Sequence, residues 1–233
     1  MEFNGKTVLV AGGTGGLGRA VSLAFLRKDA RVCVTYRSEG EFAALKGDSG
    51  THVFALQGFR ADVTSESESA ELVAKIERVD ILVNAVGAYA GGTPLWETGL
   101  DVFDRMISLN LRAGVVLARS VVPAMLGHGS GVIVNVSSRS AIDHAAGASA
   151  YAASKAAALA MMDSLAADLK GRGVRVNTVL PSIIDTPANR SAMPGADFAL
   201  WPKPEDIAQV ILFLCSDDAK LIHGAAIPVY GTS

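Results

Sequence analysis

The sequence predicts an α/β fold: one domain, residues 1–233, in which a doubly wound parallel sheet of about seven strands is flanked by helices. Short apolar, β-branched runs alternate with longer segments of helical period, the order that right-handed βαβ units produce. Of the residues, 50% are hydrophobic and only 19% are charged, which suits a sheet buried on both faces. No Pro/Gly-rich linker or internal repeat divides the chain.

The expected strands are short, and several end at residues that bend the chain or stop a ladder. The first strand runs directly into a cluster of glycines, and the fourth is closed by Gly87. The sixth ends at Pro181, which has no backbone N–H to continue the pairing. In chain order the strands are expected over Thr7–Ala11, Arg31–Tyr36, within His52–Phe59, and over Asp80–Asn84, Gly131–Val136, Val174–Leu180 and Ala226–Val229.

The intervening segments have helical period, and two of them are long. Pro123 is expected near the end of the first long helix. Residues 182–202 show no clear period, and a loop of that length in a compact domain is usually functional, so we expect a substrate lid there. The helices are expected over Leu17–Lys28, Glu41–Lys46, Ser65–Arg78, Leu100–Leu126, Ser149–Lys170 and Pro204–Cys215.

Charge and cysteine content exclude several classes of partner. The chain has 21 basic and 23 acidic residues and no basic stripe, so no nucleic acid partner is expected. Cys33 and Cys215 lie in apolar runs without a Cys/His cluster, which predicts buried thiols in a reducing compartment and no metal site. The N-terminus lacks signal-peptide character, and no stretch reaches the length of a membrane span. We therefore expect a cytoplasmic protein with no membrane partner.

A glycine-rich turn, Gly12–Gly18, joins the first strand to the first helix. Glycines permit a tight turn and let the backbone approach a pyrophosphate, while free N–H groups at the helix start bind the anion. Ordinary βα turns also use glycine, so the turn alone leaves both readings open. Its place after the first strand of an alternating chain favours dinucleotide binding.

Tyr151 and Lys155 lie four residues apart on an expected helix and therefore share one face. A free tyrosine has a pKa near 10, and a nearby lysine cation would lower it, as general acid/base work requires. Ser138 follows the strand Gly131–Val136, at the carboxyl end of the sheet where ligands bind. The alternatives are a solvated Tyr/Lys face and a serine that caps a turn.

Taken in order, Gly12-x-x-x-Gly16-x-Gly18, Asn84-Ala85-Val86-Gly87, Asn110, Ser138 and Tyr151-x-x-x-Lys155 resemble the short-chain dehydrogenase/reductase family over nearly the whole chain. The resemblance implies a Rossmann domain and a hydride passing between nicotinamide and a carbonyl or secondary alcohol. It implies that Tyr151 is the general acid/base, that Ser138 steadies the substrate oxygen, and that Asn110 holds a water in a proton relay with Lys155. The residues it assigns to the cofactor are Gly12, Thr14, Gly15, Gly16, Leu17, Gly18, Tyr36, Arg37, Asp62, Val63, Asn84, Ala85, Val86, Gly87, Tyr151, Lys155, Pro181, Ile184 and Thr186.

Three positions depart from the family pattern. Ala11 stands where threonine is common, Ala85 where a second asparagine is common, and Ser182 where glycine is usual. These departures concern the hydrogen bonding of loops rather than the ability to bind a cofactor.

The cofactor preference depends on the end of the second strand. NAD-preferring relatives carry aspartate where this chain has Tyr36, and Arg37 can accept a 2′-phosphate, so NADP(H) is favoured and NAD(H) is possible. Gly15 weighs against this preference, because many NADP-preferring relatives place a basic residue there. In the alternative reading, Arg37 is a surface residue that pairs with Glu39 or Glu41.

The lid resembles the corresponding stretch of dihydropteridine reductases in the same family, through Asp185-Thr186-Pro187-x-Asn189-Arg190 and Met193-Pro194-x-Ala196-Asp197-Phe198-x-x-Trp201. Those enzymes typically lack the catalytic serine that this chain has as Ser138. Tyr89 and Trp96 could also face the pocket. The candidate substrate residues are His144, Met193, Phe198 and Trp201, although the lid side chains could instead pin the lid to the domain.

The leading hypothesis is an NAD(P)-dependent reductase or dehydrogenase acting on a small-molecule carbonyl or alcohol. The alternatives are a dihydropteridine reductase-like enzyme, an enzyme reducing ketones on an acyl-carrier protein, and a dinucleotide-sensing protein without turnover. Small and apolar residues on the two long helices, such as Ala113, Val116, Ala156, Ala160 and Ala167, predict a homo-oligomer, a dimer or tetramer.

Overall fold

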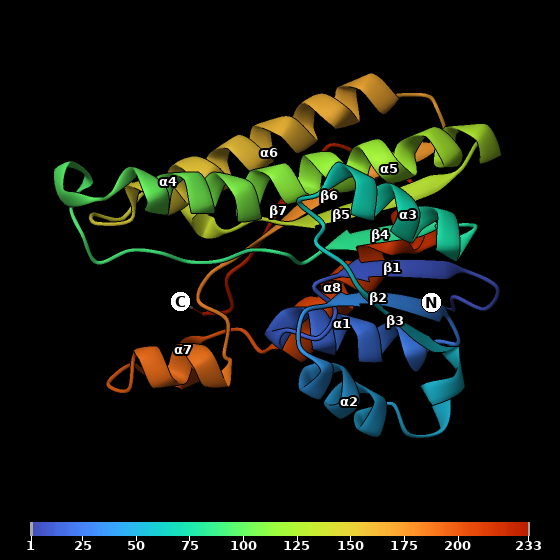
Figure 1. Cartoon of the computed structure of the whole chain (residues 1–233), viewed down its shortest axis with the longest axis horizontal. Coiled ribbons are helices and arrows are strands. Elements are labelled where there is room, and N and C mark those ends of the chain that lie inside the picture. The colour runs from blue at the N-terminus through green and yellow to red at the C-terminus, as the bar shows by residue number, and fades with distance from the viewer. Residues whose placement is uncertain (1, 233) are drawn as a thin grey trace.

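The computed structural model describes residues 2–232 and contains one parallel sheet of seven strands in the order β3-β2-β1-β4-β5-β6-β7 (Figure 1). The order reverses between β1 and β4, so the crevice at the carboxyl ends of these strands is the expected ligand site. The predicted α/β class and the doubly wound sheet are confirmed. The strands are β1 (Thr7–Ala11), β2 (Arg31–Tyr36), β3 (Leu56–Arg60), β4 (Ile81–Asn84), β5 (Gly131–Val136), β6 (Val174–Pro181) and β7 (Ala226–Val229).

Helices cover both faces of the sheet (Figure 1). One layer contains α1, α2 and α8, and the other contains α3, α4, α5 and α6, while α7 lies apart from both layers. The bounds are α1 (Gly16–Leu26), α2 (Glu39–Asp48), α3 (Glu66–Ile76), α4 (Leu100–Ile107), α5 (Ala113–His128), α6 (Ser149–Leu169), α7 (Pro187–Ala192) and α8 (Pro204–Cys215).

The alternation of side chains along β1 explains why this strand is apolar from Val8 to Ala11. Val8 and Val10 join the core cluster formed with α1 and α8, whereas Leu9 and Ala11 join the cluster formed with α5 and α6. All five residues of β1 are buried. A strand covered on both faces needs an apolar residue at every position, which is the pattern that the sequence shows.

The long helix expected over Leu100–Leu126 differs from that prediction. A π-helical turn, Ser108–Arg112, separates α4 from α5, and the helix continues past Pro123 to His128. Gly129, with φ +67°, then ends it. Such widened turns are frequent at functional sites, and this one contains Asn110.

Two other segments also differ from the prediction. The stretch after α2 forms a 3₁₀ turn, Gly50–Ala55, before β3 begins at Leu56. The lid segment contains α7, whose start is capped by the Thr186 side chain accepting from the Asn189 N–H, and a 3₁₀ turn over Phe198–Leu200. A Thr-Pro pair at a helix start is a capping signal, so the structure of the lid could have been expected.

The expectation that no stretch is long enough to span a membrane is wrong. Judged by length and composition alone, one described helix is long and apolar enough. Among the described residues, the continuous helical stretch Leu100–His128 meets both criteria, and it is the only one that does. It packs against the sheet, with Leu117, Val121 and Met125 in the core cluster. Core helices of α/β domains pass the same test. Cys33 and Cys215 are buried free thiols, as predicted.

Candidate active site

The turn between β1 and α1 forms a shallow cradle. Gly12 has φ +73°, and a Cβ there would lie 3.3 Å from the Ala85 carbonyl group, so the turn approaches the loop after β4 closely. The Gly12 N–H donates to Thr35 Oγ1 at 2.9 Å, which ties the turn to β2. A Cβ on Gly16 would meet the Thr186 methyl group at 2.8 Å, so the turn also touches the start of the lid.

The start of α1 is suited to an anion. Its N-cap is Gly15, which offers no side chain to the free N–H groups, and its first turn contains no acidic residue. The N–H groups and the helix dipole are therefore available to a phosphate group. This geometry fits the pyrophosphate of a dinucleotide, as the sequence predicted.

Lys155 lies at the centre of the site. Its side chain is buried in α6, and its Nζ donates to the Val136 carbonyl oxygen at the end of β5 at 3.1 Å. Gly87, after β4, packs against it, because a Cβ there would lie 3.0 Å from Nζ and 2.9 Å from Asn110 Oδ1. Only a glycine lets the backbone after β4 approach the lysine this closely.

The protonation of this pair differs from the expectation that the lysine would lower the tyrosine pKa. Burial lowers the pKa of Lys155 to about 8. Burial raises the pKa of Tyr151 above 10, the phenol of Tyr89 adds to the rise, and a hydrogen bond with the Ser138 side chain opposes it. Desolvation outweighs the hydrogen bond, so Tyr151 is a protonated acid at neutral pH.

Ser138 caps a turn, as the alternative reading of this residue expected, and its predicted role at the substrate oxygen stays a prediction. Its Oγ accepts from the Ser140 N–H at 3.1 Å, which caps the short turn Arg139–Ala141. The Ser138 side chain also acts on the Tyr151 hydroxyl, whose pKa it lowers. The cap fixes the Ser138 side chain beside the tyrosine, at the carboxyl end of β5.

Asn110 links three parts of the site through its side chain. Oδ1 accepts from the Ala88 N–H at 2.8 Å, and Nδ2 donates to the Ala88 carbonyl at 3.0 Å and to Ser154 Oγ at 2.9 Å. The amide thus fixes the loop after β4 against α6, one residue before Lys155. The water relay that the resemblance implies for Asn110 stays a prediction.

The predicted residues around the loops after β4 and β6 gather at one place, although several serve the fold. Asn84 donates to Asn135 Oδ1 at 2.9 Å across neighbouring strands, and its Oδ1 accepts from the Val86 N–H at 3.3 Å. Pro181 ends β6, and the Ile184 carbonyl accepts from Asn189 Nδ2 at 2.8 Å.

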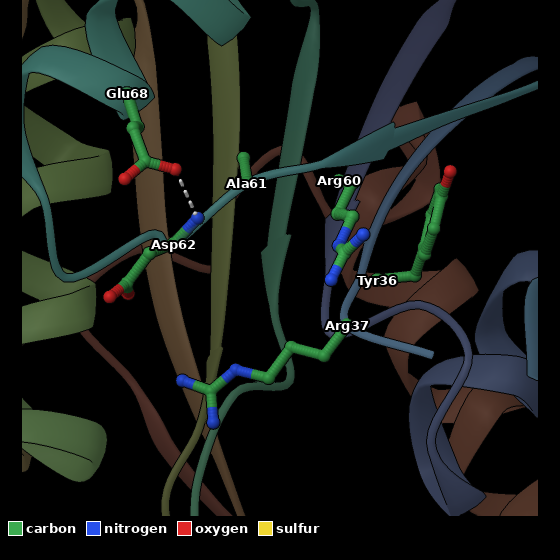
Figure 2. A pocket seen from close by; sticks show the side chains of 6 residues that line it. All are labelled: Tyr36, Arg37, Arg60, Ala61, Asp62 and Glu68. Atoms are coloured by element: carbon green, nitrogen blue, oxygen red, sulfur yellow. Dashed lines mark hydrogen bonds between the residues drawn. The ribbon is translucent and has the colours of Figure 1, made fainter. Parts of the chain in front are cut away.

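At the other end of the crevice, a cavity of about 500 Å³ opens beside β2 and β3 (Figure 2). Three of the residues that line it, Tyr36, Arg37 and Asp62, were predicted as cofactor residues. Two hydrogen bonds from Thr64 hold the carboxylate of Asp62 and lower its pKa. Val63 is buried in the adjoining core.

The structure does not support the pairing of Arg37 with Glu39 or Glu41. Glu39 accepts from the Tyr36 hydroxyl at 3.1 Å, and Glu41 accepts from Thr14 Oγ1 at 3.0 Å. Among residues 2–232, Arg37 forms no ion pair. Its charge therefore remains available to a ligand.

The lid residues divide into two groups. Trp201 is buried and contacts Phe198, with ring centroids 5.0 Å apart, and Arg190 lies 4.8 Å above the Phe198 ring while also pairing with Asp185. These contacts favour the reading in which the aromatic side chains pin the lid. His144 is exposed, and Met193 ends α7 half-buried.

The structure brings two further residues to the site: Tyr89, which the sequence indicated only as a pocket candidate, and Arg60, which sequence reasoning missed. Tyr89 contacts the ring of Tyr151, and Arg60 lines the cavity beside Arg37. Tyr89 follows closely after Gly87, so its position near the site could have been inferred from the sequence. Arg60 depends on the register between β2 and β3, which periodicity alone does not give. Within the described part of the chain, no three His, Cys, Asp or Glu side chains gather as a metal site.

Comparisons with known proteins agree with this geometry. The family model for short chain dehydrogenases matches residues 6–196. The chain is 32% identical to the 3-oxoacyl-[acyl-carrier-protein] reductase FabG of Thermotoga maritima, over 99% of this chain and 98% of the relative. It is 34% identical to D-threitol dehydrogenase of Mycolicibacterium smegmatis, over 99% and 93%. The solved structure of ElxO with NADP bound has a TM-score of 0.91 and 26% identity, covering 97% of both chains.

Proposed function

The chain belongs to the short-chain dehydrogenase family of NAD(P)-dependent oxidoreductases, and on that premise we propose that it interconverts a carbonyl group and a secondary alcohol on a small molecule. The observation that carries the proposal is the convergence of Tyr151, Ser138 and Lys155 at the carboxyl ends of β4 and β5. This is the edge of the sheet where α/β enzymes bind their ligands.

The side chains present can perform the proton chemistry of that reaction. The nicotinamide cofactor, when bound, supplies or accepts the hydride. Tyr151 donates its hydroxyl proton to the substrate oxygen in reduction and recovers a proton from the alcohol in oxidation. Ser138 donates a hydrogen bond to the same oxygen as charge develops there. The Lys155 ammonium stabilises the phenolate that Tyr151 becomes once it has lost its proton.

The raised pKa of Tyr151 supports this assignment of roles. A tyrosine with a pKa above 10 is protonated at neutral pH and is ready to act as an acid. Lys155, with its pKa lowered to about 8, is still mostly charged at pH 7. The pair therefore starts reduction in the protonation state that the mechanism needs.

We further propose a preference for NADP(H). Its support is the Arg37 side chain, which lines the cavity directly after β2 and forms no ion pair with any described residue. The last residue of β2 is Tyr36, so the strand lacks the acid that would bind the ribose of NAD. The structural neighbour ElxO holds NADP in its own structure.

The Ser138–Tyr151 hydrogen bond favours this function over a dihydropteridine reductase-like one. The resemblance to those enzymes implies a site that manages without the serine. Here the serine is capped, buried and bonded to the tyrosine. A purely dinucleotide-sensing protein would have no need of the Tyr151–Lys155 pair.

A homo-oligomer in the cytoplasm is also part of this proposal. Of the helix side chains predicted for an interface, Ala113 and Val116 are buried within the chain and cannot contact a second copy, whereas Ala160 and Ala167 are exposed on α6. Trp96, in the 3₁₀ turn Leu95–Glu97, and Leu100, at the start of α4, are 84% and 81% exposed and are further candidates for an interface. Light scattering at micromolar concentration measures the mass.

The experiment that tests the function is a turnover screen of carbonyl compounds, secondary alcohols and quinonoid dihydropterin with both cofactors. Tyr151→Phe and Lys155→Met are expected to abolish turnover of any substrate found, with unchanged circular dichroism. Near-parental kcat in both variants would refute the mechanism. Turnover of the pterin alone would favour the dihydropteridine reductase alternative.

A further inference from the structure

The cavity beside β2 and β3 has a basic side and an acidic side (Figure 2). Arg60 and Tyr36 lie on one side, and Asp62 and Glu68 lie on the other, with the Arg37 side chain extending along the cavity between them. Two of the six lining residues are arginines. The sequence alone predicts only Arg37 as a cofactor residue.

The register of the sheet brings Arg60 to this place. Tyr36 and Arg60 are partners on the parallel strands β2 and β3, so their side chains leave the same face of the sheet side by side. Arg60 is close enough to oppose the rise in the pKa of Tyr36 that burial and Glu39 cause. Arg37 follows Tyr36 directly, so both arginine side chains line the cavity at the end of β2.

The side chains of the two arginines form no hydrogen bond, whereas each carboxylate across the cavity has one oxygen engaged. Among the residues that the structure describes, neither the Arg37 nor the Arg60 side chain forms a hydrogen bond or an ion pair, although the charge of Arg37 helps to lower the pKa of Asp62. Glu68 Oε2 accepts from the Asp62 N–H at 2.8 Å, and Asp62 Oδ1 accepts from Thr64. Both guanidinium groups line the same cavity, so an anion bound there can meet two positive charges.

We propose that Arg60 acts with Arg37 as a second anchor for the 2′-phosphate of NADP(H). This inference rests on the NADP(H) preference in the proposed function and adds a residue to it. Guanidinium groups bind phosphate through paired, charge-assisted hydrogen bonds, and two of them match a dianion better than one. The carboxylate of Asp62, on the opposite side, is free to accept from the amino group of an adenine.

The position of Glu41 gives a reason for the second arginine. Its carboxylate bonds Thr14 in the glycine-rich turn, and Glu39 bonds Tyr36, so two acids at the start of α2 lie between that turn and the end of β2. They would repel a 2′-phosphate. Gly15 has no positive charge to offset this repulsion. Arg60, on the neighbouring strand β3, supplies one.

Binding of 2′,5′-ADP and 5′-AMP by calorimetry tests the proposal without any turnover, because the two probes differ only by the 2′-phosphate. Arg60→Gln and Arg37→Gln are compared with Arg31→Gln, a control on the opposite end of β2 that contacts Gln57. Each test variant is expected to lose about tenfold or more in affinity for 2′,5′-ADP, with 5′-AMP affinity within twofold of the parent. The control is expected to match the parent for both probes.

The outcomes separate this inference from the proposed function. If Arg37→Gln alone weakens 2′,5′-ADP, the assignment of Arg60 is overturned and the NADP(H) preference stands. If the parent binds both probes equally, the preference and the role of Arg60 both fail, while the turnover screen still decides the reaction. Equal losses for both probes in Arg60→Gln would also overturn the proposal, since the arginine would then act on the adenosine or the fold.

Discussion

The rings of Tyr89 and Tyr151 meet edge to face, with their centroids 5.0 Å apart and their planes at 71°. Tyr89 is 67% exposed, so it covers Tyr151 from the solvent side while leaving much of its own surface free. Asn110 fixes Ala88, the residue before Tyr89, by bonding both its N–H and its carbonyl group. The loop after β4 thus holds an aromatic ring against Tyr151, the proposed acid of the reaction.

Truncating Tyr89 tests whether this contact positions Tyr151. Edge-to-face pairs contribute about 0.5–1.5 kcal/mol beyond burial, so Tyr89→Ala is expected to lower kcat by about two- to tenfold. Tyr89→Phe keeps the ring and is expected to retain kcat. Phe54→Ala is the control, because Phe54 is 87% exposed and lies in the 3₁₀ turn Gly50–Ala55 before β3. Unchanged kcat in Tyr89→Ala, or an equal loss in the control, would contradict a positioning role.

Replacing Ser138 measures how much its hydroxyl stabilises the substrate oxygen. Ser138→Ala is expected to lower kcat/KM on the order of 10²-fold or more, as removal of an oxyanion donor does. Ser140→Ala is the matched control, because its backbone N–H, which donates to Ser138 Oγ, remains. A loss below about threefold in Ser138→Ala would favour the dihydropteridine reductase type of site.

The parts of the fold that were predictable from the sequence are those set by local patterns. The apolar run Thr7–Ala11 followed by Gly12 is a strand and a tight turn for steric reasons that act within a few residues. The pair Tyr151 and Lys155 shares a helix face by spacing alone. These features required no knowledge of the rest of the chain.

The features that were missed depend on contacts between distant segments. Arg60 lies beside Tyr36 only because β3 pairs with β2 in one particular register. The π-helical turn at Asn110 reflects its fit against Ala88 and Ser154, not a preference of its own residues. The raised pKa of Tyr151 comes from burial, which spacing does not measure.

Removing the Arg37 side chain tests the cofactor preference in turnover. The parent is expected to prefer NADPH over NADH by about 10–100-fold in kcat/KM, because a charge-assisted hydrogen bond contributes about 1.5–3 kcal/mol. Arg37→Ala should reduce that ratio toward one, with kcat/KM for NADH little changed. A parent that prefers NADH, or a ratio that the substitution leaves unchanged, would show that Arg37 does not read the phosphate.

The lowered pKa of Lys155 predicts opposite pH dependences for activity and stability. Since kcat/KM reports the free enzyme, reduction should slow as pH rises through about 8, where Lys155 loses its charge while Tyr151 is still protonated. Over about pH 8 to 10.5 the unfolded chain keeps the lysine proton that the folded chain has lost, so this group makes the free energy of unfolding rise. Lys155→Met should therefore stabilise the fold at pH 7, and that gain should shrink by pH 10. Urea unfolding at both pH values, set beside the kcat/KM profile, checks this. Activity and stability that fall together above pH 8 would attribute the lost activity to unfolding rather than to Lys155.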